Sequence, residues 1–249
     1  MSQLDEIVGR FESVSLEAMD NVKLLDRFDT KFTFRMDQLP GILAEMVPHY
    51  RVLEVSSTRS HRYETLYFDT GNLALYSKHH SGKFTRQKVR YRKYLDSQLC
   101  FFEIKTKTNK GRTLKKRIQR ADIGEVIEGE AEVLLRTQTP FCASDFRPAL
   151  RVDFTRLTFV GKSASERLTI DVNLSYRVGG KSLHLPKLVI AEVKRDKSSA
   201  GSRFTDAMRR RRIWEGSMSK YCFGIANLYP LVKRNLFKER LRQIHELAA

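Results

Sequence analysis

The chain has 249 residues, enough to bury a sizeable core, and 41% apolar with 30% charged residues excludes intrinsic disorder as the default. Its 46 Lys and Arg outnumber 29 Asp and Glu, so the net charge of +17 favours polyanionic partners. Three widely spaced cysteines, an N-terminus without a signal-peptide core and the lack of an 18-residue apolar run indicate a protein of the reducing cytoplasm with no membrane span of its own.

The N-terminal residues 1–20 are predicted to form a helix, because apolar residues recur there at helical spacing. Four more helical segments are predicted, at residues 36–47, 122–137, 201–213 and 221–246. The last of these contains an amphipathic stretch, 231–246, which we expect to pack as a cap on the core.

Strand signals dominate the remaining chain, which is rich in β-branched and aromatic residues separated by turn residues. Eight strands are predicted, at residues 24–35, 61–69, 84–95, 99–107, 112–119, 148–160, 166–175 and 187–195. Strands without regular βαβ alternation favour an antiparallel sheet or barrel, and therefore an α+β fold. No linker divides the chain, so we expect one domain over 1–249, with an N-terminal helix (1–20), a core (21–225) and a C-terminal helix (226–249).

Side chains alternate between the two faces of a strand, and most of the predicted strands place charges on one face and apolar groups on the other. The clearest case is 84–95, where Arg86, Lys88, Arg90 and Arg92 share a face. The same alternation pairs one charged face with one apolar face in 24–35, 99–107, 112–119, 166–175 and 187–195.

Two geometries satisfy this alternation. In the first, an antiparallel sheet buries its apolar face and exposes its charges to water, which is the common arrangement. In the second, a closed barrel carries the charges inside and helices cover its apolar outer face. The rows of like charge favour the second geometry, because neighbouring cations repel unless a polyanion lies between them. The sparse carboxylates among them, Asp29, Glu103, Asp171 and Glu192, suit a site for phosphates and a divalent metal.

Short motifs in a defined order carry a resemblance to a known family. They are Arg27-Phe-Asp-Thr-Lys31, Glu64-Thr-Leu-Tyr-Phe-Asp69, Lys88-Val-Arg-Tyr-Arg92, Glu103-Ile-Lys105, Lys115-Lys-Arg117, Arg156, Arg167-Leu-Thr-Ile-Asp171, Ala191-Glu-Val-Lys194 and Ser219-Lys-Tyr221. In this order the chain resembles the VTC domain, the polyphosphate polymerase module of the triphosphate tunnel metalloenzyme (CYTH-like) superfamily.

The resemblance implies an eight-stranded antiparallel β-barrel, the triphosphate tunnel, with helices packed outside and at the ends. It implies transfer of the γ-phosphate of ATP to a growing inorganic polyphosphate chain, with Mn²⁺ or Mg²⁺ as cofactor. The residues it marks as catalytic are Lys31, Arg90, Arg92, Lys105, Arg156 and Arg167. Those it marks as substrate-binding are Lys88, Lys115, Arg117, Lys194, Ser219 and Lys220. Glu192 is its metal ligand, with Glu103 and Asp171 as further candidates.

Three alternatives stay open. The same tunnel could hydrolyse inorganic or nucleoside triphosphates, or bind polyphosphate without catalysis. Nucleic-acid binding fits the net charge and the Arg209–Arg212 run, but no nucleic-acid-binding motif accompanies them, and we expect a solvated helix face there. VTC-like polymerases often work beside membrane proteins, so a membrane-protein partner at the inner face of a membrane is a further expectation. His79 and His80 are expected to be exposed, and Trp214 to pack in the core or on a helix.

Overall fold

The computed structural model describes residues 3–20, 27–110, 112–196 and 201–249. Its strands are β1 (Glu12–Val14), β2 (Arg27–Arg35), β3 (Tyr50–Leu53), β4 (Ser60–Thr70), β5 (Arg86–Tyr94), β6 (Leu99–Lys107), β7 (Thr113–Arg120), β8 (Phe146–Gly161), β9 (Glu166–Val178), β10 (Lys181–Leu185) and β11 (Leu188–Asp196). Its α-helices are α1 (Gln3–Gly9), α2 (Leu16–Asp20), α3 (Leu39–Met46), α4 (Ala74–His80), α5 (Glu130–Gln138), α6 (Arg203–Arg210), α7 (Lys220–Leu228) and α8 (Lys238–Ala248). Short 3-10 turns, η1 (Met36–Gln38), η2 (Ala143–Asp145) and η3 (Asn235–Phe237), complete the list.

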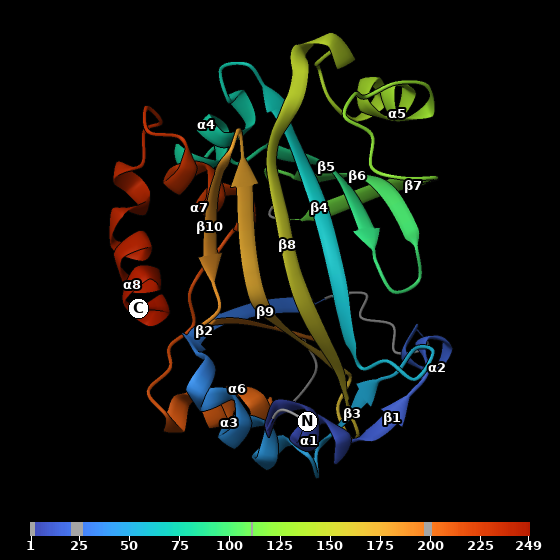
Figure 1. Ribbon diagram of the computed structural model, residues 1–249, viewed down its shortest axis with the longest axis vertical. Coiled ribbons are helices and arrows are strands. Elements are labelled where there is room, and N and C mark those ends of the chain that lie inside the picture. The colour runs from blue at the N-terminus through green and yellow to red at the C-terminus, as the bar shows by residue number, and fades with distance from the viewer. Residues whose placement is uncertain (1–2, 21–26, 111, 197–200) are drawn as a thin grey trace.

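The strands form one large antiparallel sheet with the order β2-β11-β9-β8-β4-β5-β6-β7 (Figure 1). These eight strands are the eight that the sequence predicts, although residues 24–26 of the first lie outside the described residues. Three short strands are added at the margins: β10 pairs with β9, β3 with β8, and β1 runs parallel to β3. The predicted α+β fold with an eight-stranded antiparallel path is therefore confirmed.

The sheet is strongly curled. Side chains from β2 at one end of the path and from β6 and β7 at the other line the same cavity. Within the described ranges, however, no ladder of hydrogen bonds joins β2 to β7. The predicted barrel is thus approximate: its two edges face each other across a basic interior, and they are not joined as neighbouring strands.

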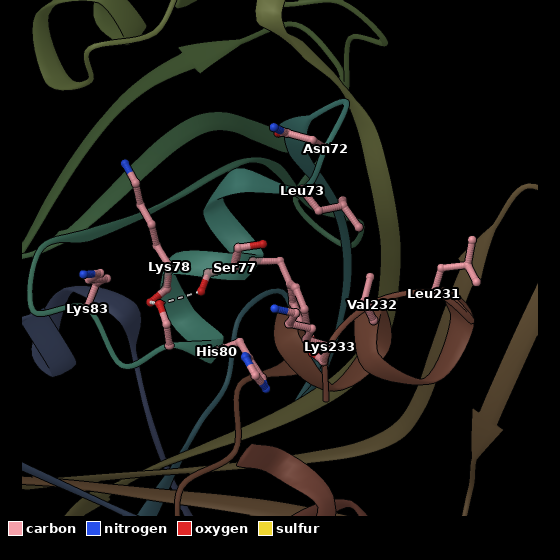
Figure 2. A pocket seen from close by; sticks show the side chains of 11 residues that line it. Asn72, Leu73, Ser77, Lys78, His80, Lys83, Leu231, Val232 and Lys233 are labelled. Atoms are coloured by element: carbon pink, nitrogen blue, oxygen red, sulfur yellow. Dashed lines mark hydrogen bonds between the residues drawn. The ribbon is translucent and has the colours of Figure 1, made fainter. Parts of the chain in front are cut away.

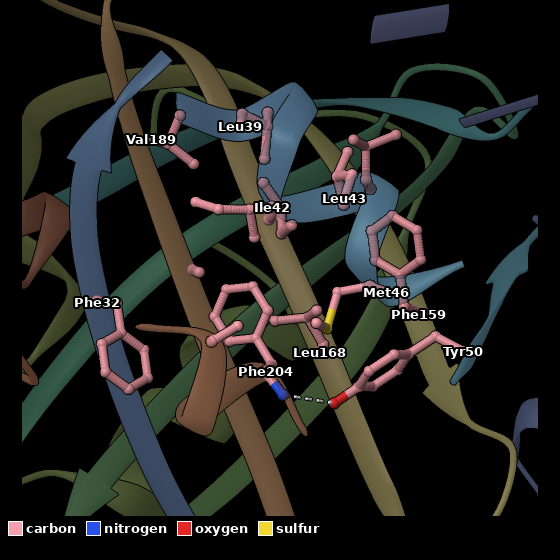
Figure 3. Close-up of a cluster of buried hydrophobic side chains, with 14 of the residues drawn as sticks. Phe32, Leu39, Ile42, Leu43, Met46, Tyr50, Phe159, Leu168, Val189 and Phe204 are labelled. Carbon is pink, nitrogen blue, oxygen red and sulfur yellow. Dashed lines mark hydrogen bonds between the residues drawn. The ribbon is translucent and has the colours of Figure 1, made fainter. Parts of the chain in front are cut away.

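The outer face of the sheet is apolar and is covered by helices. Phe32, Leu168 and Val189 pack there against Ile42 of α3 and Phe204 of α6 (Figure 3). All five side chains are no more than 2% exposed. At roughly 1.5–3 kcal/mol per buried large apolar side chain, this cluster is a principal source of stability. Because helices cover the apolar face, the charged face of the same strands points inward. This is the geometry of a barrel with a charged interior, the second of the two that the sequence allows.

Helix α7 lies on the concave side of the sheet and fills part of it. Its residues from Tyr221 to Ala226 are all buried, so the helix is enclosed on every side. Gly224 allows this packing, because a Cβ at that position would meet Leu150 Cδ2 at 2.5 Å and Tyr176 Cδ1 at 2.7 Å. The interior is therefore apolar around the body of α7 and cationic near its N-terminus.

Two predicted helices are interrupted. Residues 1–20 form α1, β1 and α2 instead of one helix, because Glu12–Val14 pair with β3 as a strand. Residues 122–129 are not helical, since Gly129 has a φ of 58° and helix α5 begins only after it. The helices predicted at 36–47 and 201–213 are confirmed as η1 with α3 and as α6.

The helix predicted at 221–246 is also divided, into α7 and α8. Pro230 follows α7 and disfavours helical backbone at the residue before it. Helix α4 was missed, and buried Asp69 explains it: the carboxylate accepts hydrogen bonds from the backbone N–H of Leu75 and Tyr76 at 2.8 and 2.9 Å. Tyr221 of α7 donates to the same carboxylate, which ties α4 to α7.

Two further expectations about single residues are wrong. Trp214 is 71% exposed and does not belong to the core, and His80 is 9% exposed and packs against Tyr76 and Phe237. The arginine run at the end of α6 is partly neutralised, because Arg210 and Arg211 both donate to Glu45 of α3. Among the described residues, no helix has both the length and the apolar character required to cross a membrane.

Candidate functional site

A cavity of about 610 Å³ occupies the concave side of the sheet beside the N-terminus of α7. Eleven cationic side chains line it: Lys31, Arg86, Lys88, Arg90, Arg92, Lys105, Lys107, Arg156, Lys194, Lys220 and Arg240. Two carboxylates line it as well, Asp29 and Glu192. Such an excess of positive charge in one enclosure is a site for a compact polyanion.

Strand β5 supplies the central row of cations. Its alternation places Lys88, Arg90 and Arg92 on the cavity side, while Val89 and Tyr91 pack into an apolar cluster behind the strand. Arg90 and Arg92 are only 5% and 8% exposed. The row of cations predicted from the alternation along the strand is therefore present, and packing of the opposite, apolar face holds the strand in place.

Arg90 is neutralised by its neighbour on β6. Its Nε and one terminal nitrogen donate to Glu103 at 2.9 and 2.6 Å, and the other terminal nitrogen donates to Tyr67 Oη at 3.1 Å. Lys115 Nζ lies 2.5 Å from the other oxygen of Glu103. Burial raises the pKa of Glu103, but Arg90, Arg92 and Lys115 outweigh it and hold the carboxyl well below its ordinary range. Both oxygens of this carboxylate are thus engaged by cations.

A second buried carboxylate, Asp171 of β9, neutralises Arg156 as Glu103 neutralises Arg90. Arg156 holds it through two hydrogen bonds of 2.6 and 2.8 Å, and Lys220 donates to it as well. Burial raises the pKa of Asp171, but Arg156 and Lys220 more than offset this and keep it well below its ordinary range. The Arg156 guanidinium and the Lys220 ammonium both lie over the ring of Phe154, at 5.3 and 4.6 Å from its centroid.

Glu192 is one of the two carboxylates in the cavity lining. It pairs with Lys31 of β2 and, at 2.8 Å, with Lys194 of its own strand, and its side chain is 18% exposed. Burial raises its pKa, but Lys194 and Lys31 dominate, so that it lies well below the ordinary range. Glu192 is therefore ionised at neutral pH and accessible to a ligand in the cavity.

The described residues contain no group of three His, Cys, Asp or Glu side chains that could hold a metal ion by themselves. A Mg²⁺ ion does not require such a group, because it commonly keeps several waters and binds one or two carboxylates together with substrate phosphates. Glu192 and Asp29, both in the lining, fit that mode. Glu103 and Asp171 fit it less well, since neither lines the cavity and their side chains are only 0% and 4% exposed, against 18% for Glu192.

Among the described residues, no carboxylate forms a close ion pair with Lys88, Arg92 or Lys105, although the charge of Glu103 acts on Arg92 and Lys105 from farther away. Arg92 donates to Thr65 Oγ1 at 3.3 Å, and its guanidinium carbon lies 5.6 and 5.7 Å from the ring centroids of Tyr63 and Phe154; Lys88 donates to Ser219 Oγ at 2.8 Å. Arg90, burial and Arg92 push the pKa of Lys105 well below its ordinary value. Burial, together with like charges, also lowers the pKa of Lys88. The positive charges of the site therefore repel one another, and a bound anion would reduce that repulsion.

The first turn of α7 completes the wall. Ser219 is its N-cap, accepting from the backbone N–H of Cys222 at 3.2 Å, and Lys220 is its first residue. The unsatisfied N–H groups and partial positive charge of a helix N-terminus favour anions. Here they add to the cations of β5.

Five predicted site residues lie outside the cavity lining: the buried carboxylates Glu103 and Asp171 described above, and three cations. Arg167 donates to the backbone oxygen of Met19 at 3.1 Å, Arg117 lies over the ring of Phe101 at 4.4 Å, and Lys115 reaches the site only through Glu103. The remaining predicted cations and Ser219 all line the cavity.

His79 and Arg240 are two of the lining residues that sequence reasoning did not assign to the site. His79 lies beside Lys88, and burial followed by Lys88 lowers its pKa to about 3, so it is neutral in the cavity. It belongs to α4, which was not predicted, so the sequence placed it in an exposed loop. Arg240 comes from α8, and it had no signal beyond its place on an amphipathic helix.

A second cavity, of about 520 Å³, lies between α4 and the segment that precedes α8 (Figure 2). Lys78, Lys83 and Lys233 are in its lining, which shares no residue with the first cavity. Lys83 and Lys233 are exposed, whereas Arg90 and Arg92 are buried and fixed by contacts. The first cavity is accordingly the candidate site.

The family model described as the VTC domain matches residues 26–229. Among solved structures, the chain is similar to a Bacillus halodurans protein provisionally named an adenylate cyclase, with 12% identity over 82% of this chain and 97% of that chain and a TM-score of 0.51. It is also similar to a Hippeastrum protein provisionally named an adenylyl cyclase and described as having a dominant triphosphatase activity, with 14% identity over 82% and 99% of the two chains and a TM-score of 0.46. A search of curated proteins found no match. At such identities, the first likeness shows a common fold alone.

Proposed function

This chain belongs to the VTC domain family of the triphosphate tunnel superfamily, and from that premise we propose that it is a metal-dependent polyphosphate polymerase. Under this proposal it transfers the γ-phosphate of ATP to the end of an inorganic polyphosphate chain. The substrates are ATP and the polymer, and the products are ADP and a polymer longer by one phosphate.

The observation that carries the proposal is the uncompensated charge of the cavity. Eleven cations and two carboxylates line it, and within the described ranges Lys88, Arg92 and Lys105 form no close ion pair with a carboxylate. Burial and neighbouring cations lower the pKa of Lys88 and Lys105, so a bound anion would stabilise their charged forms. A chain of phosphates supplies several negative charges along one line, which matches a row of side chains on one strand.

The proposed roles follow from these positions. Arg92 and Arg156 would hold phosphate oxygens with planar guanidinium groups, and Lys88, Lys105 and Lys220 would act as point charges. Arg90 would contribute its remaining N–H groups while staying fixed by Glu103. Lys115, Arg117 and Arg167 receive no direct phosphate contact under this proposal, because they lie outside the lining.

Phosphoryl transfer requires in-line positioning and charge neutralisation more than covalent chemistry. The terminal oxygen of a polyphosphate is ionised at neutral pH, so no general base is needed. It forms a bond to the γ-phosphorus of ATP as the bond to the β–γ bridging oxygen breaks, and ADP leaves with that electron pair. The cations of β5 would hold the two chains in line and neutralise the charge that they bring together.

A divalent ion, Mn²⁺ or Mg²⁺, would withdraw charge from the phosphate oxygens when bound. Glu192 would hold it, with Asp29 as the second carboxylate in reach of the same cavity. Glu103 and Asp171 serve instead to fix Arg90 and Arg156. A cytoplasmic location and a membrane-protein partner at the inner face of a membrane belong to the proposal on the family resemblance alone.

The experiment that tests the proposal is incubation with ATP and Mn²⁺, scoring ADP, free phosphate and long polymer separately. Polymer formed by the wild type and lost in Arg92→Ala supports the polymerase. The matched control is Arg177→Ala, which removes an arginine whose side chain is 51% exposed and paired with Asp153. Free phosphate without polymer would replace the proposal by a triphosphatase at the same site. Absence of both products from a protein that still binds tripolyphosphate would leave a binding module.

A further inference from the structure

The C-terminal helix α8 contributes to the cavity although it lies beyond the residues that the family model matches. That match ends at residue 229, and α8 spans Lys238–Ala248. Arg240, Leu241 and Ile244 of this helix are nevertheless in the cavity lining. This part of the wall is therefore a feature of this chain, and the family match does not account for it.

Arg240 joins α8 to two other parts of the wall. Its Nε donates to the backbone oxygen of Ser217 at 3.1 Å, and one terminal nitrogen donates to Thr33 Oγ1 of β2 at 2.9 Å. The other terminal nitrogen donates to Gln243 of its own helix at 3.1 Å. All three acceptors are neutral, and burial lowers the pKa of Arg240. The contacts therefore orient the guanidinium instead of neutralising it.

Gly216 shows how closely the guanidinium packs on this segment. A Cβ at Gly216 would lie 2.8 Å from one terminal nitrogen of Arg240 and 2.9 Å from its Cζ. Such distances leave no room for a side chain unless Arg240 moves away. The backbone N–H of Gly216 donates to the oxygen of Lys31 at 2.9 Å, so the same residue is fixed from β2 on its other side.

The clamped segment leads directly into the phosphate site. Ser217 is two residues before Ser219, which receives the Lys88 hydrogen bond and caps α7. Lys220 follows at once and donates to Asp171. The position of residues 216–217 consequently determines where the first turn of α7 presents its hydroxyl, its ammonium and its backbone N–H groups.

We propose that Arg240 is a positioning residue that clamps residues 216–217 against β2 and thereby sets Ser219 and Lys220 for the phosphate chain. The inference rests on the proposed phosphate-binding function of the cavity. Arg240 acts through its planar fork, because a single group reaches Ser217, Thr33 and the surface of Gly216 together. An ammonium group could replace the charge but not this combination of contacts.

Calorimetric titration with inorganic tripolyphosphate, without metal, tests the inference on the full chain. Arg240→Ala should weaken the affinity about tenfold, the scale of one or two lost hydrogen bonds. Arg240→Lys should stay closer to Arg240→Ala than to the wild type. Arg242→Ala is the matched control, since Arg242 is on the same helix with a side chain 73% exposed and paired with Glu246.

The Gly216→Ala variant should lose tripolyphosphate affinity through the same contact, without changing Arg240 itself. Its methyl group displaces only the mobile end of the Arg240 side chain, so the fold should persist while the clamp is broken. The loss should resemble that of Arg240→Ala, and the double variant should bind no more weakly than either single one. Hydrogen exchange at residues 214–222 should accelerate in both single variants and stay unchanged in Arg242→Ala.

Three results would overturn the inference while a wild type that binds tripolyphosphate upholds the phosphate-binding role of the cavity. The first is equal affinity for Arg240→Ala and Arg242→Ala, and the second is full rescue by Arg240→Lys, which would make Arg240 a simple charge. The third is additive losses for Gly216→Ala and Arg240→Ala. A wild type that fails to bind tripolyphosphate would instead overturn the proposed function and the positioning role with it.

Discussion

Lys88 Nζ donates a hydrogen bond of 2.8 Å to Ser219 Oγ, which joins the cation row of β5 to the N-terminus of α7. The same oxygen accepts the backbone N–H of Cys222 at 3.2 Å. One hydroxyl therefore orients a cation whose pKa is lowered by burial and caps the helix whose first turn faces the cavity. The strand and the helix form a single anion site because of this contact.

Ser219→Ala should weaken tripolyphosphate binding and also destabilise the protein. Loss of the N-cap costs about 1 kcal/mol, and loss of the Lys88 partner frees that ammonium to adopt other rotamers. Ser202→Ala is the matched control, because Ser202 caps α6 by accepting from Thr205 N at 3.1 Å and lies outside the cavity lining. Urea denaturation should show a loss of stability for both variants, larger for Ser202→Ala because that hydroxyl also bonds Tyr50 and Glu166, and calorimetry a loss of affinity for Ser219→Ala alone. Equal affinities of the Ser219→Ala and Ser202→Ala variants would mean that Ser219 caps the helix without contributing to phosphate binding.

Arg90→Ala and Arg92→Ala should differ in stability. Removing Arg90 leaves the fully buried Glu103 with Lys115 as its remaining partner, and breaking a buried pair costs about 3–5 kcal/mol. Removing Arg92 loses its contacts with the rings of Tyr63 and Phe154 but relieves repulsion between cations, so we expect a change within about 1 kcal/mol. Chemical denaturation measures both. A larger loss for Arg92→Ala would mean that the charge assignments within the site are wrong.

Glu192→Gln should change binding with and without metal in opposite directions. In the absence of metal, removing a negative charge from the cationic cavity should keep or improve tripolyphosphate affinity by up to about tenfold, on the scale of 1.4 kcal/mol. In the presence of Mn²⁺, the additional affinity that the ion confers should disappear. Asp37→Asn, at a side chain 64% exposed and paired with Arg35, is the control. Unchanged enhancement by Mn²⁺ in Glu192→Gln would assign the ion to other ligands.

The stability of the protein should fall with pH because of His79. Its pKa is about 3 in the folded chain against an ordinary 6.5, as burial and Lys88 disfavour the imidazolium. Between these values the unfolded chain binds more protons, so the free energy of unfolding decreases as pH falls, by about 1 kcal/mol per unit. His79→Gln should flatten this slope between pH 6.5 and 4.5, and replacement of the exposed His184 by Gln should not. An identical slope in all three proteins would contradict the burial of a neutral His79.

Parity in the sequence identified much of the site, because alternation along a strand is a local property. Lys88, Arg90 and Arg92 share the cavity face as predicted, and the eight predicted strands form the continuous path of the sheet. The alternation along a strand does not predict which cations are neutralised by carboxylates. The Arg90–Glu103 and Arg156–Asp171 pairs depend on the register between neighbouring strands, which single-strand patterns do not contain.

Other parts of the site depend on contacts between segments far apart in the chain. Helix α4 depends on the buried cap Asp69, and without it His79 was assigned to an exposed loop. Arg240 approaches β2 only after Pro230 separates α8 from α7. The helix predicted at 1–20 failed because pairing of Glu12–Val14 with β3 outweighed a periodic apolar pattern. Each miss comes from a tertiary contact that replaced a local preference.

The central claim is that the cavity binds a chain of phosphates, and calorimetric titration of tripolyphosphate into wild type and Arg92→Ala tests it most directly. Arg92 is buried in the lining and forms no close ion pair with a carboxylate of the described residues, so its removal should preserve the fold and weaken binding at least tenfold. The exposed Arg177→Ala variant should bind like the wild type. Equal affinity of Arg92→Ala and Arg177→Ala, or no binding by the folded wild type, would contradict the claim.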